Sequence, residues 1–194
     1  MCIRDSFYGE IALEKKVCGF TGYRPEKLPY GTDERHPDCI CLKKELLQQV
    51  YRAVEDGMTY FICGGAQGAD TFAAEAVLFA QKAHPEIVLE IAAPFLGQER
   101  AWAPRQQARY HTILDKAQRI TYISDTPAVE HFFQRNRYIV DHADRIVAVF
   151  DGKRGGTAQT VRYAEKQGKQ LVRLSPTGKV LEEDRQLRFP WEPA

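Results

Sequence analysis

The stretch Phe61-Ile62-Cys63-Gly64-Gly65-Ala66-Gln67-Gly68-Ala69-Asp70 is typical of the end of a buried strand, a glycine-rich turn and the start of a helix. Glycine has no Cβ, so the backbone can turn sharply and a ligand can approach it closely. A helix that begins after such a turn directs unpaired N–H groups and a partial positive charge toward it. The stretch therefore predicts a phosphate site. The structural alternative is a tight strand-to-helix connection with Asp70 as the helix cap.

Apolar and amphipathic segments alternate along the rest of the chain at the spacing of α/β proteins. Strands are predicted at residues 17–21, 59–63, 87–93, 120–123, 145–150 and 170–174. Helices are predicted at residues 40–56, 70–82, 131–142 and 155–167, and residues 98–117 are mostly helical with a break at Pro104. Because the strands are continuous apolar runs, we predict an α/β fold with a mostly parallel sheet of about six strands and helices on both faces.

The composition is that of one globular domain with short appendages. The chain has 194 residues, of which 44% are hydrophobic and 27% are charged, which suffices for a sizeable core. The domain is predicted to span residues 17–174. Residues 1–16 are expected to be a disordered or extraneous leader, and residues 175–194 a polar C-terminal tail with little to bury.

Charge, hydropathy and the number of cysteines indicate the cellular compartment of the protein. A formal net charge of +1 provides no strong attraction to nucleic acid or membranes. No apolar run approaches the ~20 residues needed to span a bilayer, and residues 1–16 lack the apolar segment of a secretory signal. The five cysteines are an odd number, and Cys18 and Cys63 fall in predicted core strands. We therefore expect reduced thiols and a cytoplasmic protein that does not associate with membranes.

Three glycine-bearing turns follow predicted strand ends, after Thr21, Cys63 and Phe150. In a parallel sheet these ends share one rim, and ligands of open α/β sheets bind beyond it. The convergence of three such turns favours a binding site over three simple connections. The spacing matches neither the Walker motif nor the dinucleotide fingerprint, so an ordinary kinase or dehydrogenase is not indicated.

Charged side chains in these turns suit an anionic ligand. Arg24 can hold a phosphate through its guanidinium group or be a surface loop arginine. Asp70 can bind ribose hydroxyls or cap the helix. Residues 155–157 form a second helix N-terminus, and Lys153 and Arg154 add positive charge beside it.

Two further segments supply candidate side chains. Trp102 can stack on a base or pack on the core, and Gln98 lies one helical turn before it. Glu99 can act as a general base or be a solvated surface acid. Arg135 and Asn136, expected at the start of a helix, can reach a phosphate or a base edge, or lie on a solvated helix face.

Several of these motifs together resemble the YpsA-like proteins of the SLOG superfamily. The motifs are Phe20-Thr21-Gly22-Tyr23-Arg24-Pro25, the glycine turn, Pro94-Phe95-x-x-Gln98-Glu99-x-x-Trp102, residues 134–144 and Gly155-Gly156-Thr157. The resemblance covers residues 17–174. It implies a Rossmann-like three-layer fold that binds a nucleotide or nucleotide derivative related to NAD or ADP-ribose, and, by analogy, a homo-oligomer.

Two related groups of proteins supply alternatives. Lonely Guy phosphoribohydrolases carry an arginine that Arg135 resembles and a later P-G-G-x-G-T-x-x-E segment. This sequence departs from that segment at residues 150–152 and has Thr160 in place of the glutamate. The DNA-processing protein DprA has a glycine turn similar to residues 65–70 and an R-N-R segment similar to residues 135–137. Its rim binds single-stranded DNA, a use that the near-neutral charge of this chain disfavours.

The first hypothesis is a protein that binds a small nucleotide, as a sensor or as an enzyme of unassigned reaction. The alternatives are an N-glycosidic-bond hydrolase and a single-stranded DNA-binding module. The candidate catalytic residues are Glu99, Asp70 and Arg135. No metal site is expected, because His36, Cys39 and Cys41 lack a second ligand pair of zinc type. The candidate nucleotide-binding residues are Gly22, Tyr23, Arg24, Gly64, Gly65, Gln67, Gly68, Asp70, Gln98, Trp102, Arg135, Asn136, Gly155, Gly156 and Thr157.

Overall fold

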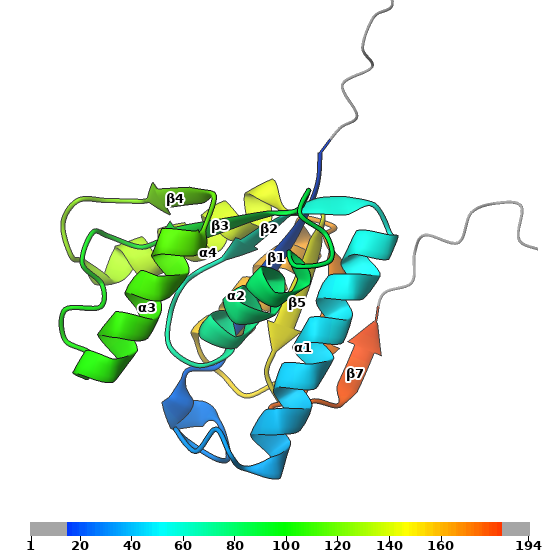
Figure 1. Cartoon of the computed structure of the whole chain (residues 1–194), viewed down its shortest axis with the longest axis horizontal. Helices are drawn as coiled ribbons and strands as arrows, with labels where there is room; N and C mark the ends of the chain where they lie inside the picture. The colour runs from blue at the N-terminus through cyan, green and yellow to red at the C-terminus, as the bar shows by residue number, and fades with distance from the viewer. Residues whose placement is uncertain (1–14, 184–194) are drawn as a thin grey trace, which may run out of the picture.

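A computed structural model describes residues 15–183 of the chain (Figure 1). Seven strands form one sheet in the order β4-β3-β2-β1-β5-β6-β7. The strands are β1 (Lys16–Gly22), β2 (Met58–Cys63), β3 (Val88–Ala93), β4 (Arg119–Tyr122), β5 (Arg145–Val149), β6 (Gln170–Leu174) and β7 (Val180–Glu183). The helices are the short 3-10 helix η1 (Pro25–Lys27), α1 (Pro37–Glu55), α2 (Ala69–Ala80), α3 (Pro104–Lys116), α4 (Val129–His142) and α5 (Gly156–Lys166).

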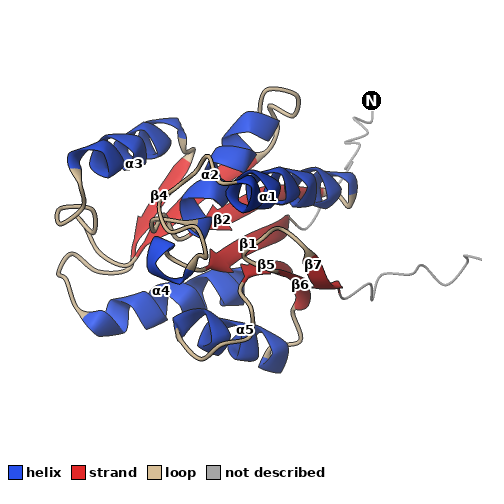
Figure 2. Cartoon of the chain, turned by 90° about the horizontal axis from the view of Figure 1, so that it is seen from below, coloured by secondary structure: helices blue, strands red, loops and turns tan. Residues whose placement is uncertain are grey.

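The elements form three layers. Helices α1, α2 and α3 cover one face of the sheet and α4 and α5 cover the other (Figure 2). Strands β1 to β6 pair in parallel, and β7 pairs with β6 in the antiparallel direction. The predicted Rossmann-like α/β fold is therefore confirmed. None of the helices within residues 15–183 combines the length and hydrophobicity that a bilayer crossing requires.

The order of the strands reverses between β1 and β5. The chain runs outward from β1 to β4 and then returns to place β5 on the opposite side of β1. The loops that follow β1 and β5 therefore lead to helices on opposite faces of the sheet (Figure 2). Such a reversal opens a crevice beyond the carboxyl ends of the two strands, which is where open α/β sheets bind ligands.

The sequence prediction misses β7, which lies in the expected polar tail. Val180 and Leu181 of this strand are 40% and 56% exposed, so β7 has neither a buried run nor a clean alternation to reveal it. The leader and the end of the tail, residues 1–14 and 184–194, lie outside the described residues.

The starts of three helices also differ from the prediction, and α1 begins at Pro37 rather than at residue 40. Residues 98–103 form turns rather than helix, because Pro104 occupies the first position of α3, where a proline needs no N–H partner. Helix α4 begins at Val129, so Arg135 and Asn136 lie in its middle rather than at its start. Ala128 and Val129, the apolar residues before His131, are partly or fully exposed and do not extend the helical pattern of apolar residues, so the sequence did not reveal the earlier start.

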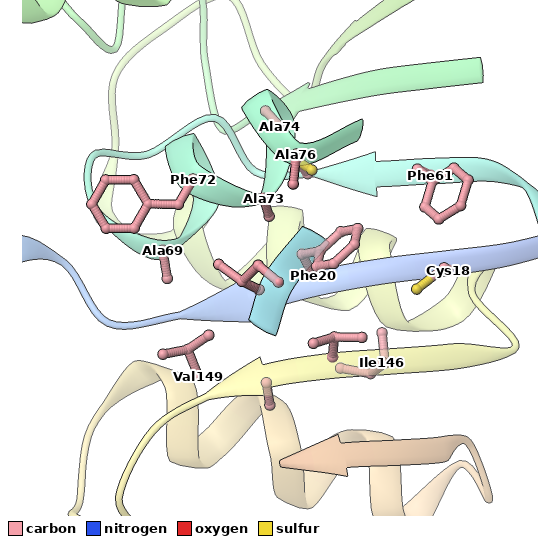
Figure 3. Packing of buried hydrophobic residues seen from close by; sticks show 14 of the residues in the cluster. Cys18, Phe20, Phe61, Ala69, Phe72, Ala73, Ala74, Ala76, Ile146 and Val149 are labelled. Carbon is pink, nitrogen blue, oxygen red and sulfur yellow. The ribbon is translucent and has the colours of Figure 1, made fainter. Parts of the chain in front are cut away.

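The core is packed tightly around β1. The rings of Phe20 and Phe61 stack with centroids 6.3 Å apart (Figure 3). On the same side, the small side chains of Ala69 and Ala73 are directed from α2 toward β1 (Figure 3). On the α4 face, a Cβ at Gly19 would overlap the side chain of Ile139 in α4. Helices α2 and α4 therefore both pack closely against β1.

Glu90 of β3 is a buried carboxylate, 1% exposed, held by three hydroxyl groups. It accepts hydrogen bonds from Tyr60 at 2.6 Å, Thr121 at 2.7 Å and Tyr138 at 2.8 Å. Burial alone would raise its pKa, but these hydrogen bonds and the nearby Arg119 guanidinium lower the pKa below its ordinary value. The network joins β2, β3, β4 and α4 at a distance from the glycine turns.

We expect Glu90→Gln to lower the free energy of unfolding at pH 7 by about 2 kcal/mol, because charge-assisted hydrogen bonds become neutral ones. A carboxyl with a lowered folded-state pKa stabilises the fold above its unfolded pKa of about 4.3, and this contribution is lost as pH falls through the folded value. Urea unfolding from pH 7 to pH 3 should therefore show the two proteins converging. A difference independent of pH would contradict this account. Glu55→Gln, exposed on α1, is the control and should change stability by less than about 0.5 kcal/mol.

Candidate functional site

A cavity of about 300 Å³ opens where the strand order reverses, beyond the ends of β1 and β5. It is formed by the loop after β1, the first turns of α2 and α5, and one side of α4. The lining residues are Thr21, Gly22, Tyr23, Arg24, Glu26, Lys27, Ala66, Asp70, Phe132, Phe133, Arg135, Asn136, Gly156 and Thr157. Turns after β1, β2 and β5 thus share one rim, as the sequence predicts.

The glycines of the first two turns make room for the protein's own backbone. The Tyr23 N–H donates to the Val149 carbonyl at 3.1 Å, and the Tyr23 carbonyl accepts from the Ala69 N–H at 3.0 Å. A Cβ at Gly22 would overlap Ala69, and a Cβ at Gly68 would lie 2.6 Å from the Tyr23 carbonyl oxygen. Gly68 also has a φ of +88°, which favours glycine. These glycines therefore let the two loops pack together, and Gly22, Tyr23 and Ala66 of these loops form a wall of the cavity.

A buried ion pair lies beneath this wall. Arg135 Nη1 donates to Asp70 Oδ2 at 3.2 Å, and both residues are nine-tenths or more buried. Asp70 is the second residue of α2 and does not cap the helix, whose N-cap is Gly68, so the capping alternative is wrong. Burial raises the pKa of Asp70, and the Arg135 charge opposes that rise. Arg135 Nε is buried and has no hydrogen-bond partner among the described residues.

Positive groups border the open side of the cavity. The Arg24 guanidinium is exposed and lies 5.0 Å from the centre of the Phe132 ring. Lys27 Nζ donates to the Arg154 carbonyl at 3.3 Å, which places this ammonium beside the start of α5. Helix α5 follows Gly155 and has no side-chain cap. Its first N–H groups and its dipole therefore add to the positive potential.

Gly156 differs from the other glycines of the rim. A Cβ at this position would meet nothing within 4 Å, so the space next to the backbone is open. Gly156 and Thr157 both line the cavity in the first turn of α5. Free N–H groups facing open space are the geometry that binds phosphate at a helix N-terminus.

Tyr23 is oriented by the loop that follows β5. Its hydroxyl donates to Asp151 Oδ1 at 2.5 Å, and Lys153 pairs with the same carboxyl group at 2.7 Å. The Lys153 and Tyr23 contacts lower the pKa of Asp151 to about 2. Burial, followed by the hydrogen bond to Asp151, raises the pKa of Tyr23. The phenol therefore stays neutral and holds the loops after β1 and β5 together.

Several predicted site residues do not line the cavity, and three of them, Gln98, Glu99 and Trp102, contact α3 instead. The Gln98 amide donates to the Tyr110 hydroxyl at 2.9 Å, and the Trp102 ring packs 5.3 Å from the Tyr110 ring. Glu99 lies 3.2 Å from His111 Nε2. The predicted residues outside the lining are Gly64, Gly65, Gln67, Gly68, Gln98, Trp102, Gly155 and Glu99.

Six residues of the cavity are absent from the predicted site residues: Thr21, Glu26, Lys27, Ala66, Phe132 and Phe133. Glu26 and Lys27 follow Arg24 directly in the sequence after Pro25. Both lie in the short helix η1, which places them at the rim. Phe132 and Phe133 precede Arg135 on α4, and two adjacent aromatic residues beside a predicted rim arginine were an available signal. Within residues 15–183 no group of three or more His, Cys, Asp or Glu side chains is arranged to hold a metal ion.

A mostly parallel sheet, with a cavity lined by charged and aromatic residues at its switch point, is the arrangement of a ligand-binding domain of Rossmann-like class. Comparison with known families agrees with this class and identifies the family. The chain belongs to the YpsA family, described as the YspA SLOG family, whose family model matches residues 18–175.

Relatives of known sequence carry the name UPF0398 protein. Those of Bacillus thuringiensis (strain Al Hakam) and Bacillus cereus (strain AH187) are each 32% identical over 156 residues. Each comparison covers 79% of this chain and 84% of the relative.

Among solved structures, DNA processing protein A (DprA) has a similar fold. The Helicobacter pylori protein, reported with its single-stranded DNA binding mode, has a TM-score of 0.58 at 19% identity, over 87% of this chain and 68% of its own. The Streptococcus pneumoniae protein has a TM-score of 0.54 at 15% identity, over 82% of this chain and 50% of its own. This chain thus spans half the length of the latter.

We expect Gly64→Ala to lower the free energy of unfolding by about 1–3 kcal/mol, because its new methyl group would overlap the Arg135 guanidinium and displace the buried pair. Gly156→Ala is the matched control and should change it by less than about 0.5 kcal/mol, since the added group meets open space. Chemical denaturation measures both values. Equal effects of the two substitutions would contradict the packing role of Gly64.

We expect Arg135→Met to cost about 3–5 kcal/mol at pH 8, because Asp70 would remain buried without its partner. The pKa of Asp70 is already raised by burial, so lowering the pH protonates this carboxyl group and should reduce the loss. The double variant Asp70→Asn/Arg135→Met should lose less than the sum of the single losses. Strict additivity of the two losses would show that the pair is not coupled.

Proposed function

We propose that the protein binds a nucleotide or nucleotide derivative in the cavity at the switch point, with a phosphate group at the N-terminus of α5. One observation carries this proposal: the uncapped start of α5, Arg24, Lys27 and Arg135 all line one cavity of about 300 Å³. The Nε of Arg135 is also buried without a hydrogen-bond partner among the described residues. The proposal is independent of the net charge of +1, since it rests on local charge.

The balance of charge in the cavity favours an anion. Arg24, Lys27 and Arg135 are its cations, and Glu26 and Asp70 are its carboxylates. The charges of Asp70 and Arg135 cancel within their ion pair. The remaining positive groups are Arg24, Lys27 and the N-terminus of α5, and Glu26 is the remaining negative group of the lining. A phosphate group would find charge-assisted hydrogen-bond donors here from side chains and backbone.

Aromatic and amide groups suit the nucleoside part of the ligand. Phe132 and Phe133 offer rings on which a base can stack, and the Asn136 amide can pair with a base edge or a hydroxyl group. Glu26 is the free carboxylate that can accept hydrogen bonds from ribose hydroxyls. NAD and ADP-ribose remain candidate ligands on these grounds.

The geometry supports binding more directly than it supports a reaction. An N-glycosidic hydrolase would have to use Glu26 or Asp70, the carboxylates that line the cavity, because Glu99 does not. Asp70 is engaged by Arg135, and this contact holds its carboxylate against a buried cation. We therefore favour a sensor or carrier of a nucleotide in the cytoplasm over a hydrolase.

The hypothesis that this protein binds single-stranded DNA is supported by the similarity of fold alone. DprA shares the sheet and helices at less than 20% identity, which does not transfer its ligand to this chain. The α5 N-terminus and a 300 Å³ cavity fit one nucleotide unit. Competition by oligonucleotides is therefore an arm of the experiment.

We expect AMP and ADP-ribose to raise the melting temperature of the purified protein, and adenosine, which lacks the phosphate, to raise it far less. Arg24→Gln should weaken AMP binding about tenfold to a hundredfold in calorimetry, because a charge-assisted hydrogen bond contributes about 1.5–3 kcal/mol. Arg105→Gln, an exposed arginine on α3 outside the cavity, is the matched control and should bind as the wild type does.

The outcomes of this experiment would decide between the hypotheses. If adenosine binds as tightly as AMP, or if no nucleotide binds, the phosphate site at α5 does not exist. If an oligonucleotide displaces AMP and binds more tightly, the DNA-binding alternative gains. Free adenine released during incubation with AMP would identify a hydrolase, and an unchanged ligand would identify a binding protein.

A further inference from the structure

A second cavity of about 200 Å³ continues from the first along the outer face of the molecule, between α4 and α5. Its walls are Phe133, Asn136 and Arg137 of α4 and Gln159, Thr160 and Tyr163 of α5. Residues three and four apart lie on one side of a helix, so each helix presents a continuous face to the groove. Phe133 and Asn136 line both cavities, which therefore adjoin.

The groove presents aromatic surfaces in fixed positions. The Tyr163 hydroxyl donates to Asp141 at 2.7 Å, and the Arg137 guanidinium lies 5.4 Å from the centre of its ring. Phe133, at the junction of the two cavities, is 46% exposed although its side chain is wholly apolar. Exposed rings on a rigid helix are suitable surfaces for stacking a planar base.

Amide groups on opposite walls are free to recognise a base edge. Asn136 and Gln159 make no side-chain hydrogen bond to any residue within 15–183. Each amide can donate and accept, as the edge of a base requires. Thr160, in contrast, uses its hydroxyl to donate to the Gly156 carbonyl at 3.0 Å.

We propose that this groove binds the second base of a dinucleotide, whose bridging phosphates lie at the N-terminus of α5. The inference rests on the proposed function, since it places the phosphates in the first cavity. From Thr157 to Tyr163 the helix rises about 9 Å, the length over which a ribose and a base extend from a phosphate. The first cavity then holds one nucleoside and the groove holds the other.

The charges of the groove define the class of base. The positive charge of Arg137 favours an uncharged ring over a cationic one. At the far end, the Asp141 carboxylate accepts from Tyr163, and Lys169 Nζ lies 3.4 Å from the Asp141 carbonyl oxygen. The groove therefore suits a dinucleotide with a neutral second base.

The experiment compares ligands that differ by single parts. Diadenosine 5′,5′-diphosphate and ADP-ribose share the phosphates and one nucleoside, and differ by the second adenine. We expect calorimetry with the wild type to give at least tenfold tighter binding for diadenosine diphosphate than for ADP-ribose. Gln159→Trp should fill the groove and abolish this advantage, while the affinity for AMP changes less than twofold. Arg162→Trp, exposed on the same helix and outside both cavities, is the control and should keep the advantage.

The failure of this inference can be told from the failure of the proposed function. If AMP binds and depends on Arg24, but diadenosine diphosphate binds no more tightly than ADP-ribose, the groove is not a base site. Retention of the advantage in Gln159→Trp overturns it equally, as does tighter binding of a hexanucleotide than of the dinucleotide. If the wild type binds none of these nucleotides, both proposals fail. Circular dichroism and the melting temperature confirm that the exposed substitutions leave the fold intact.

Discussion

The ion pair between Asp70 and Arg135 connects the two layers of helices at the carboxyl end of the sheet. Asp70 comes from α2 on one face and Arg135 from α4 on the other, and the pair passes beneath the turn after β2. Each charge loses its hydration on burial, at a cost of several kcal/mol that only the partner and a few hydrogen bonds offset. We infer that the pair contributes geometry more than net stability, since it allows one relative position of α2 and α4.

This constraint explains the glycines better than ligand binding does. Gly64 has no side chain because the Arg135 guanidinium occupies the space where a Cβ would lie. Gly22 and Gly68 let the loops after β1 and β2 meet, with Ala69 between them. A glycine-rich turn between a strand and a helix therefore creates the site indirectly, by bringing charged and aromatic side chains to one rim. Gly156 alone among these four faces open space.

Much of the fold could be predicted from the sequence, because buried parallel strands appear as apolar runs and their helices as amphipathic ones. The position of the three glycine-bearing turns at one rim could be predicted as well, because the strands are parallel. The burial and the contact partners of the candidate site residues could not be predicted, because they depend on residues that are far apart in the chain. Trp102 and Gln98 pack on Tyr110, and Asp70 meets Arg135 across 65 residues of sequence. Strand β7 escaped prediction because pairing with β6, not burial, forms it.

The same constraint bears on what the cavity can do. Because Asp70 already holds Arg135 in place, an anion bound as we propose would meet a cation that needs no rearrangement. Such preorganisation favours affinity, since little ordering accompanies binding. Catalysis of bond cleavage would need an acid or base that can exchange a proton with the ligand. Here the buried carboxylate is committed to a guanidinium, and Glu26 is exposed at the rim. This arrangement is consistent with the proposed binding of a phosphate-bearing ligand, for which the rings and the amide of α4 would supply specificity.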